Sequence, residues 1–445
     1  MSAAADPLAP FDVATSGWTR RHAAHLLWRA QHGATDAEVT RAHEEGLPAT
    51  LDRLLSPQPE TSEFTAADAT LAQLAADSGD IGDLKAWWAH RIVRTANPLV
   101  EKMTLFWHNH FATSNTKVDS VPRMTAQNDT LRTHAVGSFR ELLGAMTRDV
   151  AMLVWLDGNA NRRRQPNENF ARELLELFAL GVGNYTERDI QEAARAFTGG
   201  HVRQEKFWFN ARQHDEGAKQ VFGASGNFDG GEIIDLCLAQ PSCACFLATK
   251  LLRQFVMPLP PDQSIDALAA KLREQDYQLA PALRTLFASE LFFSAAAERS
   301  IIKSPADLVL GTLRTLEARA NLRPAVQLMA ELGQNLFEPP TVKGWEGGRL
   351  WINSASMLKR ANFATDLAFS DRYGAIADPA ELAASRHWRR IDEMLQHYVE
   401  LLWSADAGES LPLLEQAMSE THGTLSQRLR GVVHLVLAAP RYQLM

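Results

Sequence analysis

Three carboxylates and two side-chain amides lie close together in the segment PNENFARELLELFALG, Pro166 to Gly181. An α-helix turns by about 100° per residue, so this segment would have one apolar and one polar face. The polar face would carry Asn169, Arg172, Glu173 and Glu176. A carboxyl group there would serve as general acid or base on a glycan-like substrate if burial raised its pKa. Candidate catalytic residues are therefore Glu168, Glu173 and Glu176, together with Arg172.

The same segment also fits an ordinary amphipathic helix. Phe170, Leu174 and Leu177 would pack against the core, and the charged side chains would face water. Arg172 and Glu176, one turn apart, would then form an ion pair. On this alternative the segment needs no catalytic role.

The residues that precede this segment favour a functional site over an ordinary amphipathic helix. The stretch DGNANRRRQPNEN is dense in carboxamides. Asparagine is a poor helix former, but its side chain fixes turns and contacts ligands. Asp157, Asn167 and Asn169 are therefore candidate substrate-binding residues.

Imidazoles form a second group of candidates, with His108 and His110 in FWHNHF and His214 in HDEGAK. In a continuous helix, side chains two residues apart point about 160° apart. His108 and His110 would therefore bind one metal ion only if the helix ended at Trp107. Together with the carboxylates, the three imidazoles would suit zinc, manganese or iron, and the metal would lower the pKa of a bound water. The alternative is a core histidine whose ring nitrogens are satisfied by backbone or carboxylate partners.

A glycine-rich loop with two tryptophans forms a third group. Trp345 and Trp351 bracket Glu346 and two glycines in PPTVKGWEGGRLW. Such aromatic side chains would stack on sugar rings or form a lid, and Trp345 and Trp351 are candidate substrate-binding residues. They would equally serve as plugs that anchor the loop to the core.

Composition and motifs exclude several classes of protein. The chain has 445 residues, a net charge of −8 and no basic stripe of the kind that nucleic-acid-binding proteins show. It lacks the GxSxG, P-loop and GxGxxG motifs, and no HExxH spacing supports the possible divalent metal site. Cys237, Cys243 and Cys245 do not have the spacing of a zinc half-site or the even number of a disulfide framework. We expect them to be small buried residues.

The N-terminal segment does not have a basic stretch followed by an apolar stretch, so we expect no secretory signal. No apolar run approaches the roughly 18 residues of a membrane-spanning helix. These features predict a cytoplasmic protein. Export to the periplasm together with a signal-bearing partner is the alternative.

Helical periodicity dominates the chain and predicts an all-α fold. Predicted helices cover residues 18–31, 35–45, 65–76, 81–95, 97–111, 233–256, 264–274, 280–290, 354–369, 388–403 and 426–438. Helix-start signals are Asn97 before Pro98, Thr186 with Asp189, and Ser304 with Asp307.

One region departs from helical periodicity. Residues 206–210 and 219–222 alternate in polarity around a polar turn and predict a short β-hairpin or extended excursion, followed by the glycine-rich loop GASGNFDGG. No internal repeat is visible. We predict a flexible segment over residues 1–17 and one helical domain over residues 18–445.

Long segments of the chain resemble the bacterial domain-of-unknown-function 1800 (DUF1800) family. The resemblance rests on NPLVEKMTLFWHNHFATS, AMLVWLDGNANRRRQPNENFARELLELFALGVGNYTERDIQEAARAFTGG, HDEGAK, IIKSPADLVL and LFEPPTVKGWEGG. It implies a largely helical protein whose gene often lies beside that of an alkaline-phosphatase- or sulfatase-like protein with a twin-arginine export signal. It assigns no activity. This chain departs from the family at Gly200, where members often have Trp, and in lacking an export signal.

Two hypotheses from different classes follow. The first is a hydrolase whose cleft is formed by the helix after Asn97, the segment 167–176 and the turn at His214, and whose mechanism is metal-assisted or carboxylate acid–base. The second is a non-catalytic protein that binds or matures the phosphatase- or sulfatase-like neighbour. The first requires an open pocket with unpaired His and carboxylate atoms, whereas the second requires that these groups pair with one another.

Overall fold

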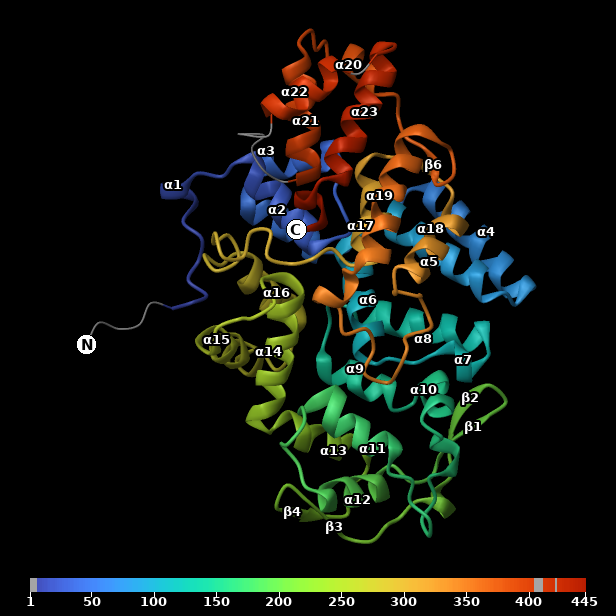
Figure 1. Cartoon of the computed structure of the whole chain (residues 1–445). Coiled ribbons are helices and arrows are strands. Elements are labelled where there is room, and N and C mark those ends of the chain that lie inside the picture. Colours follow the sequence, from blue (N-terminus) through green and yellow to red (C-terminus); the bar gives the residue numbers. More distant parts are fainter. Residues whose placement is uncertain (1–5, 404–410, 421) are drawn as a thin grey trace.

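The computed structural model describes residues 6–403, 411–420 and 422–445 and confirms the predicted all-α fold (Figure 1). Within those residues, strands occur only as short antiparallel pairs. The body is elongated: the N-terminal and C-terminal helices share one end, and the polypeptide around residues 160–230 forms the other (Figure 1).

Most of the described residues lie in helices. Up to residue 196 the helices are α1 (Val13–Ser16), α2 (Arg20–Ala30), α3 (Asp36–Leu55), α4 (Ser62–Ser78), α5 (Ile81–Arg94), α6 (Pro98–His110), α7 (Asn115–Val118), α8 (Val121–Thr133), α9 (Phe139–Met146), α10 (Val150–Trp155), the 3₁₀ turn η1 (Gly158–Ala160), α11 (Asn169–Glu173), the π-helix η2 (Leu174–Ala179) and α12 (Glu187–Ala196). After residue 196 they are η3 (Ala211–Gln213), α13 (Gly230–Leu238), α14 (Pro241–Phe255), α15 (Asp262–Glu274), α16 (Leu279–Phe287), α17 (Pro305–Thr315), α18 (Leu322–Glu331), η4 (Gly348–Trp351), α19 (Ser354–Phe369), α20 (Pro379–Ser385), α21 (Ile391–Trp403), α22 (Leu411–Glu420), α23 (Leu425–Ala438) and η6 (Pro440–Gln443).

Local capping signals set several helix starts. Thr186 with Asp189, and Ser304 with Asp307, form the predicted capping boxes, in which each side chain accepts the backbone N–H of the other residue. Pro98 begins α6 as predicted, but the side chain of Asn97 does not cap the helix. Its Oδ1 instead accepts a hydrogen bond from the backbone N–H of Gln58, at 2.7 Å.

The single helix predicted over residues 233–256 is wrong. The chain forms α13 and α14, which meet at an angle of 76°. Pro241 begins α14, because a proline lacks the N–H that a continuous helix would need but fits the first turn of a new one. No single described helix is long and apolar enough to span a membrane; α13 and α14 pass that test only as a bent pair, by length and composition.

The segment after Asn169 is helical, but it is not one α-helix. The π-helix η2 follows α11, and the N–H of Leu180 donates to the carbonyl of Leu175, five residues earlier. A π-turn holds more residues than an α-turn, so the apolar face rotates: Leu175 is buried, whereas Leu177 is only half-buried. Leu174 and Phe178 are buried as predicted, whereas Leu177 only packs partly buried against the core and Leu175, which was not predicted, is fully buried.

Strands form in the predicted region, but as two hairpins. β1 (Gly200–Arg203) pairs with β2 (Lys206–Phe209), and β3 (Lys219–Val221) pairs with β4 (Ala224–Gly226). Gln204 and Glu205 both have positive φ, as do Phe222 and Gly223, which is the type I′ geometry that closes two-residue hairpins. Each strand thus pairs with its immediate neighbour in sequence. A further short pair joins β5 (Arg319–Ala320) to β6 (Gly374–Ala375).

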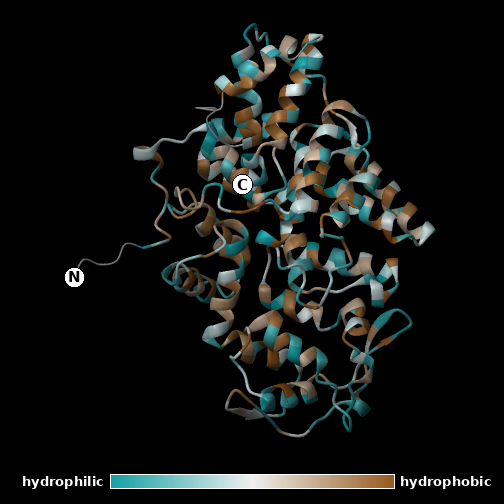
Figure 2. Ribbon diagram, viewed as in Figure 1, coloured by the Kyte–Doolittle hydropathy of each residue, from teal (hydrophilic) through white to brown (hydrophobic). Residues whose placement is uncertain are grey.

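The core consists of two hydrophobic clusters, one built largely from α2, α3, α6 and α9–α16, the other from α5, α17–α19 and α21–α23. α2 and α6 contribute to both clusters: Leu27 and Phe106 belong to the first, and Trp28 and Leu105 to the second. Along most helices, apolar residues alternate with polar ones, as expected of amphipathic elements (Figure 2). α6 therefore lies at the centre of the molecule.

The N-terminal segment contacts the helical body. The N–H of Phe11 donates to the carbonyl of Ala288, and the N–H of Glu290 donates to the carbonyl of Ala9. Residues 1–5 of the predicted flexible segment lie outside the described residues. The domain boundary at residue 17 stays a prediction.

Candidate functional site

A central cavity of about 1030 Å³ is lined by α6, α14, the start of α17 and the loop that carries the two tryptophans. Its volume suits a ligand of small-molecule size. The buried and half-buried polar side chains that line it include His32, Lys102, Asn109, His110, Lys250 and Asp307. Arg253, Lys343, Glu346 and Arg349 line it from exposed positions.

Asn109 holds the tryptophan loop against α6. Its Oδ1 accepts from the backbone N–H of Trp345 at 2.6 Å, and its Nδ2 donates to the carbonyl of the same residue at 3.2 Å. Gly344 has φ of +78°, and a Cβ there would lie 2.2 Å from Asn109 Oδ1. Only glycine combines this backbone conformation with this close approach. Trp345 and Trp351 are both buried and line the cavity, so they form part of its wall and also anchor the loop to the core.

His110 has a defined orientation at the cavity wall. Its Nε2–H donates to the carbonyl of Phe178 at 2.9 Å, so its Nδ1 carries a lone pair and accepts from Lys250 Nζ at 2.9 Å. Lys250 also contacts the carbonyl of Leu177, at 3.4 Å. His110 and Lys250 thereby satisfy carbonyls at the end of η2 that have no intrahelical partner.

Lys250 carries a charge that no described carboxylate neutralises within ion-pair distance. Burial lowers the pKa of its ammonium group to about 8. The ammonium lies 4.8 Å from the centroid of the Phe246 ring. Burying an unpaired charge is costly, and an anion bound in the cavity would offset that cost.

His108 does not share the cavity with His110. α6 continues through His110, so the condition for joint metal binding by the two imidazoles is not met. His108 is buried, its Nε2 accepts from the backbone N–H of Phe337 at 3.2 Å, and burial lowers its pKa to about 3. Among the described residues, no group of three or more His, Cys, Asp or Glu side chains could hold a metal ion.

A buried cluster that the sequence did not reveal lies at the wall of the central cavity. His32 Nδ1 lies 2.8 Å from Asp307 Oδ1, and Lys102 Nζ donates to the same oxygen. All three residues are at most 3% exposed. The ammonium of Lys102 and the hydrogen bond from His32 hold the pKa of Asp307 far below its usual range against the effect of burial. Asp307 is therefore an anion, and an anion only accepts hydrogen bonds, so His32 Nδ1 carries the proton.

The other ring nitrogen of His32 is unused. His32 Nε2 is buried and has no hydrogen-bond partner among the described residues. With the proton on Nδ1, Nε2 presents a lone pair. Burial lowers the pKa of this imidazole, which keeps it neutral. An unpaired buried acceptor beside a cavity calls for a functional explanation.

Gly33 allows His32 to reach α17. It has φ of +71°, and a Cβ there would lie 2.2 Å from the carbonyl oxygen of Gly311. The chain after α2 therefore passes α17 at a distance that only glycine permits. The sequence signal for this site was weak: Asp307 was recognisable as a cap, whereas His32 had no motif around it.

A separate pocket of about 430 Å³, which we call the hairpin pocket, lies between the β1–β2 hairpin, α9 and α13. It is lined by two of the predicted residues, Asn167 and His214. It shares no lining residue with the central cavity. The predicted site residues that line a hollow are thus divided between two hollows: Asn167 and His214 in one, and His110, Trp345 and Trp351 in the other.

The predicted catalytic carboxylates line neither hollow. Arg172 pairs with Glu168 and Glu187, and Glu176 accepts from the hydroxyl of Tyr185 at 2.8 Å. Glu173 is half-buried, and burial together with nearby Glu176 raises its pKa. The catalytic role of these residues stays a prediction.

Two of the predicted substrate-binding residues serve the local fold. Asp157 has a left-handed backbone and pairs with Lys117 at 2.9 Å. The backbone N–H of Asn169 donates to Asn167 Oδ1 at 2.9 Å. The dense carboxamides before α11 therefore fix a turn. Fixing turns was one of the two roles expected of these asparagines, beside contact with a ligand.

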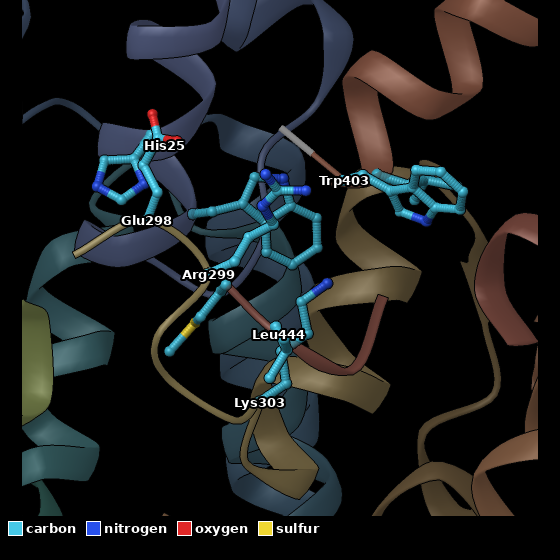
Figure 3. Close-up of a pocket in the computed structure, with 9 residues that line it drawn as sticks. His25, Glu298, Arg299, Lys303, Trp403 and Leu444 are labelled. Atoms are coloured by element: carbon cyan, nitrogen blue, oxygen red, sulfur yellow. The ribbon is translucent and has the colours of Figure 1, made fainter. Parts of the chain in front are cut away.

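A third hollow lies beside the C-terminal residues and is lined by His25, Lys303, Trp403 and Leu444, among others (Figure 3). Its volume is about 10 Å³, which is room for one water at most. Lys303 Nζ lies 3.4 Å from the centroid of Tyr442 and 3.9 Å from that of Trp28, and it acts as a packing group. This hollow does not hold a ligand.

The fold and these hollows define a helical protein with a large central cavity that is lined in part by charged side chains. Residues 25–444 match the family described as "Protein of unknown function (DUF1800)". The chain therefore belongs to this family. No curated protein and no solved structure matches it.

Proposed function

We propose that the chain is a hydrolase that binds an anionic substrate in the central cavity and uses His32 as its general base. The observation that carries this proposal is the state of His32. Its Nδ1 donates to an ionised carboxylate, its buried Nε2 has no partner among the described residues, and the residue lines a cavity of about 1030 Å³. The supporting chemistry is that of a His–Asp pair, in which the carboxylate fixes the tautomer and stabilises the imidazolium that forms.

The proposed reaction is attack by water on a substrate bound in the cavity. His32 Nε2 takes a proton from the water as the water attacks. Asp307 stays ionised throughout, because Lys102 remains beside it. The proton then passes from His32 to the leaving group, which restores the neutral imidazole.

An anionic substrate is supported by the charges around the cavity. Five Lys or Arg side chains line it, against the two carboxylates of Asp307 and Glu346. Asp307 is already paired with Lys102, whereas Lys250 has no carboxylate partner among the described residues. A phosphate or sulfate group would supply the missing negative charge.

The proposal is tested with chromogenic p-nitrophenyl esters of phosphoric, sulfuric and carboxylic acids. The unmodified chain is expected to hydrolyse at least one of them, and His32→Gln to lower turnover by about 10²-fold or more, since an amide cannot act as a base. Binding of inorganic sulfate, measured by calorimetry, is the matched control and should survive in His32→Gln. Equal turnover by both proteins would remove His32 from the mechanism.

A second candidate function is non-catalytic binding or maturation of a phosphatase- or sulfatase-like partner. It is favoured by the pairing of Arg172 with Glu168 and Glu187, and of Glu176 with Tyr185. If the chain hydrolyses none of the esters and co-purifies with such a partner, the results would favour this function over the first.

A further inference from the structure

The hairpin pocket has aromatic walls. Phe170, Phe197, Phe207 and Phe209 all line it. Phe170 and Phe197 meet edge to face, with ring centroids 5.1 Å apart. Aromatic rings prefer such edge and offset contacts with other rings, so these walls favour a flat aromatic ligand.

The inner polar side chains of this pocket already have protein partners. Asn161 donates to a carbonyl of α12 and accepts from the backbone N–H of Asn167. Asn167 accepts from the backbone two residues later and donates to a carbonyl before η1. The hydroxyl of Thr198 donates to a carbonyl of α12 and accepts from the backbone N–H of Asp215. Each of these polar atoms therefore already has a partner within the protein.

His214 is different, because one of its ring nitrogens remains available. Its Nδ1 lies 2.9 Å from the carbonyl oxygen of Thr198. A carbonyl oxygen only accepts, so Nδ1 carries the proton and Nε2 carries the lone pair in the neutral imidazole. Among the described residues, Nε2 has no hydrogen-bond partner. Arg148 and Asp229, which also line the pocket, lie at exposed positions, and Asp229 caps α13 by accepting from the backbone N–H groups of Gly231 and Glu232.

The segment around His214 is held rigidly. Asp215 pairs with Arg195 at 2.9 Å, and that contact lowers the pKa of Asp215 to about 2. Gly199 has φ of +89°, and a Cβ there would lie 2.8 Å from the carbonyl of Asn210. These constraints fix the imidazole before any ligand arrives, which lowers the entropic cost of binding.

We infer that the hairpin pocket is a second ligand site, which binds a small phenol: an aromatic ring between the phenylalanines, with its hydroxyl donating to His214 Nε2. A sugar fits poorly, because several of its hydroxyl groups would face the apolar walls and lose their hydrogen bonds to water. The pocket volume of about 430 Å³ accommodates one such molecule. The inference does not depend on the hydrolase proposal.

Calorimetry with p-cresol, toluene and methyl β-glucoside tests the ligand class on the full chain. p-Cresol should bind about tenfold more tightly than toluene, because one hydrogen bond of the usual net strength is worth about a tenfold change in Kd. Methyl β-glucoside should not compete. Failure of p-cresol to bind, binding no tighter than that of toluene, or equal binding of the glucoside would each overturn the inference.

Two variants test the position of the ligand. His214→Phe keeps a ring and removes the acceptor, so p-cresol affinity should fall to that of toluene. Gly144→Leu adds a side chain at the pocket wall, where a Cβ meets no atom within 4 Å, and should abolish binding of both ligands. Ala66→Leu, at an exposed position of α4, is the matched control and should bind normally. Unchanged p-cresol binding in Gly144→Leu, which does not depend on how well His214→Phe folds, would overturn the inference.

Discussion

His32 Nδ1 lies 2.8 Å from Asp307 Oδ1, although 275 positions separate the two residues in the chain. Lys102 completes the cluster from α6. Three elements distant in sequence therefore meet at one wall of the central cavity, and this meeting has measurable consequences.

Asp307→Asn should destabilise the fold by about 3–5 kcal/mol, because it leaves the buried ammonium of Lys102 without a counter-charge. Urea unfolding at neutral pH measures the change. Asp235→Asn is the control: Asp235 pairs with Arg140 in an exposed ion pair, whose loss should cost less than about 1 kcal/mol. Equal effects of the two substitutions would contradict a buried charge cluster.

Gly33→Ala should separate His32 from Asp307, since its Cβ would lie 2.2 Å from the carbonyl of Gly311. The expected result is a clear loss of thermal stability together with loss of any His32-dependent turnover. Gly79→Ala is the matched control, because Gly79 has a similar φ of +64° but no atom within 4 Å of its Cβ. If both variants melted alike, backbone conformation alone would explain the effect.

Sulfate binding to the central cavity should depend on the protonation of Lys250. Its pKa is lowered to about 8, so affinity should hold below pH 8 and weaken as pH rises through that value. Calorimetry between pH 7 and 9.5 measures this. Lys250→Arg keeps the charge and should bind without that pH dependence, whereas Lys250→Met should not bind. A pH-independent affinity in the unmodified chain would argue that sulfate binds elsewhere.

Asp149 should make stability depend on pH in the opposite sense to most carboxylates. Burial raises its pKa to about 6, so the protonated form is favoured by folding. The contribution of Asp149 to the free energy of unfolding is present below about pH 4, which is the pKa of this side chain in the unfolded protein. It is lost as the pH rises towards 6. Asp149→Asn should therefore match the unmodified chain at pH 4 and exceed it by about 2–3 kcal/mol at pH 7.5. Equal free energies of unfolding at pH 7.5 would show that Asp149 is solvated.

Glu173→Gln decides between the two candidate bases. If His32 is the base, Glu173→Gln should keep turnover within about twofold, and His32→Gln should lose about 10²-fold. Glu173 has a pKa raised by burial and by Glu176, so it remains a competitor. The reverse pattern, with Glu173→Gln inactive and His32→Gln active, would move the chemistry to α11.

Short-range signals predicted much of the fold. The capping boxes at Thr186 and Ser304 formed as expected, because each depends on residues three positions apart. The break at Pro241 was also a local signal, but a continuous apolar pattern across residues 233–256 hid it. The π-turn in η2 had no local signal, since it appears where His110 and Lys250 bond to the carbonyls at its end.

The sequence by itself determined the fold class, most helix starts and the family, because periodicity, capping and motif segments act over a few residues. It also pointed to His110, His214, Trp345 and Asn167 as residues beside hollows. Only the tertiary structure decided that these residues divide between two hollows, and that His32 shares a wall with Asp307. Hydrogen bonds across hundreds of residues depend on how α2, α6 and α17 pack, and no local spacing encodes that packing.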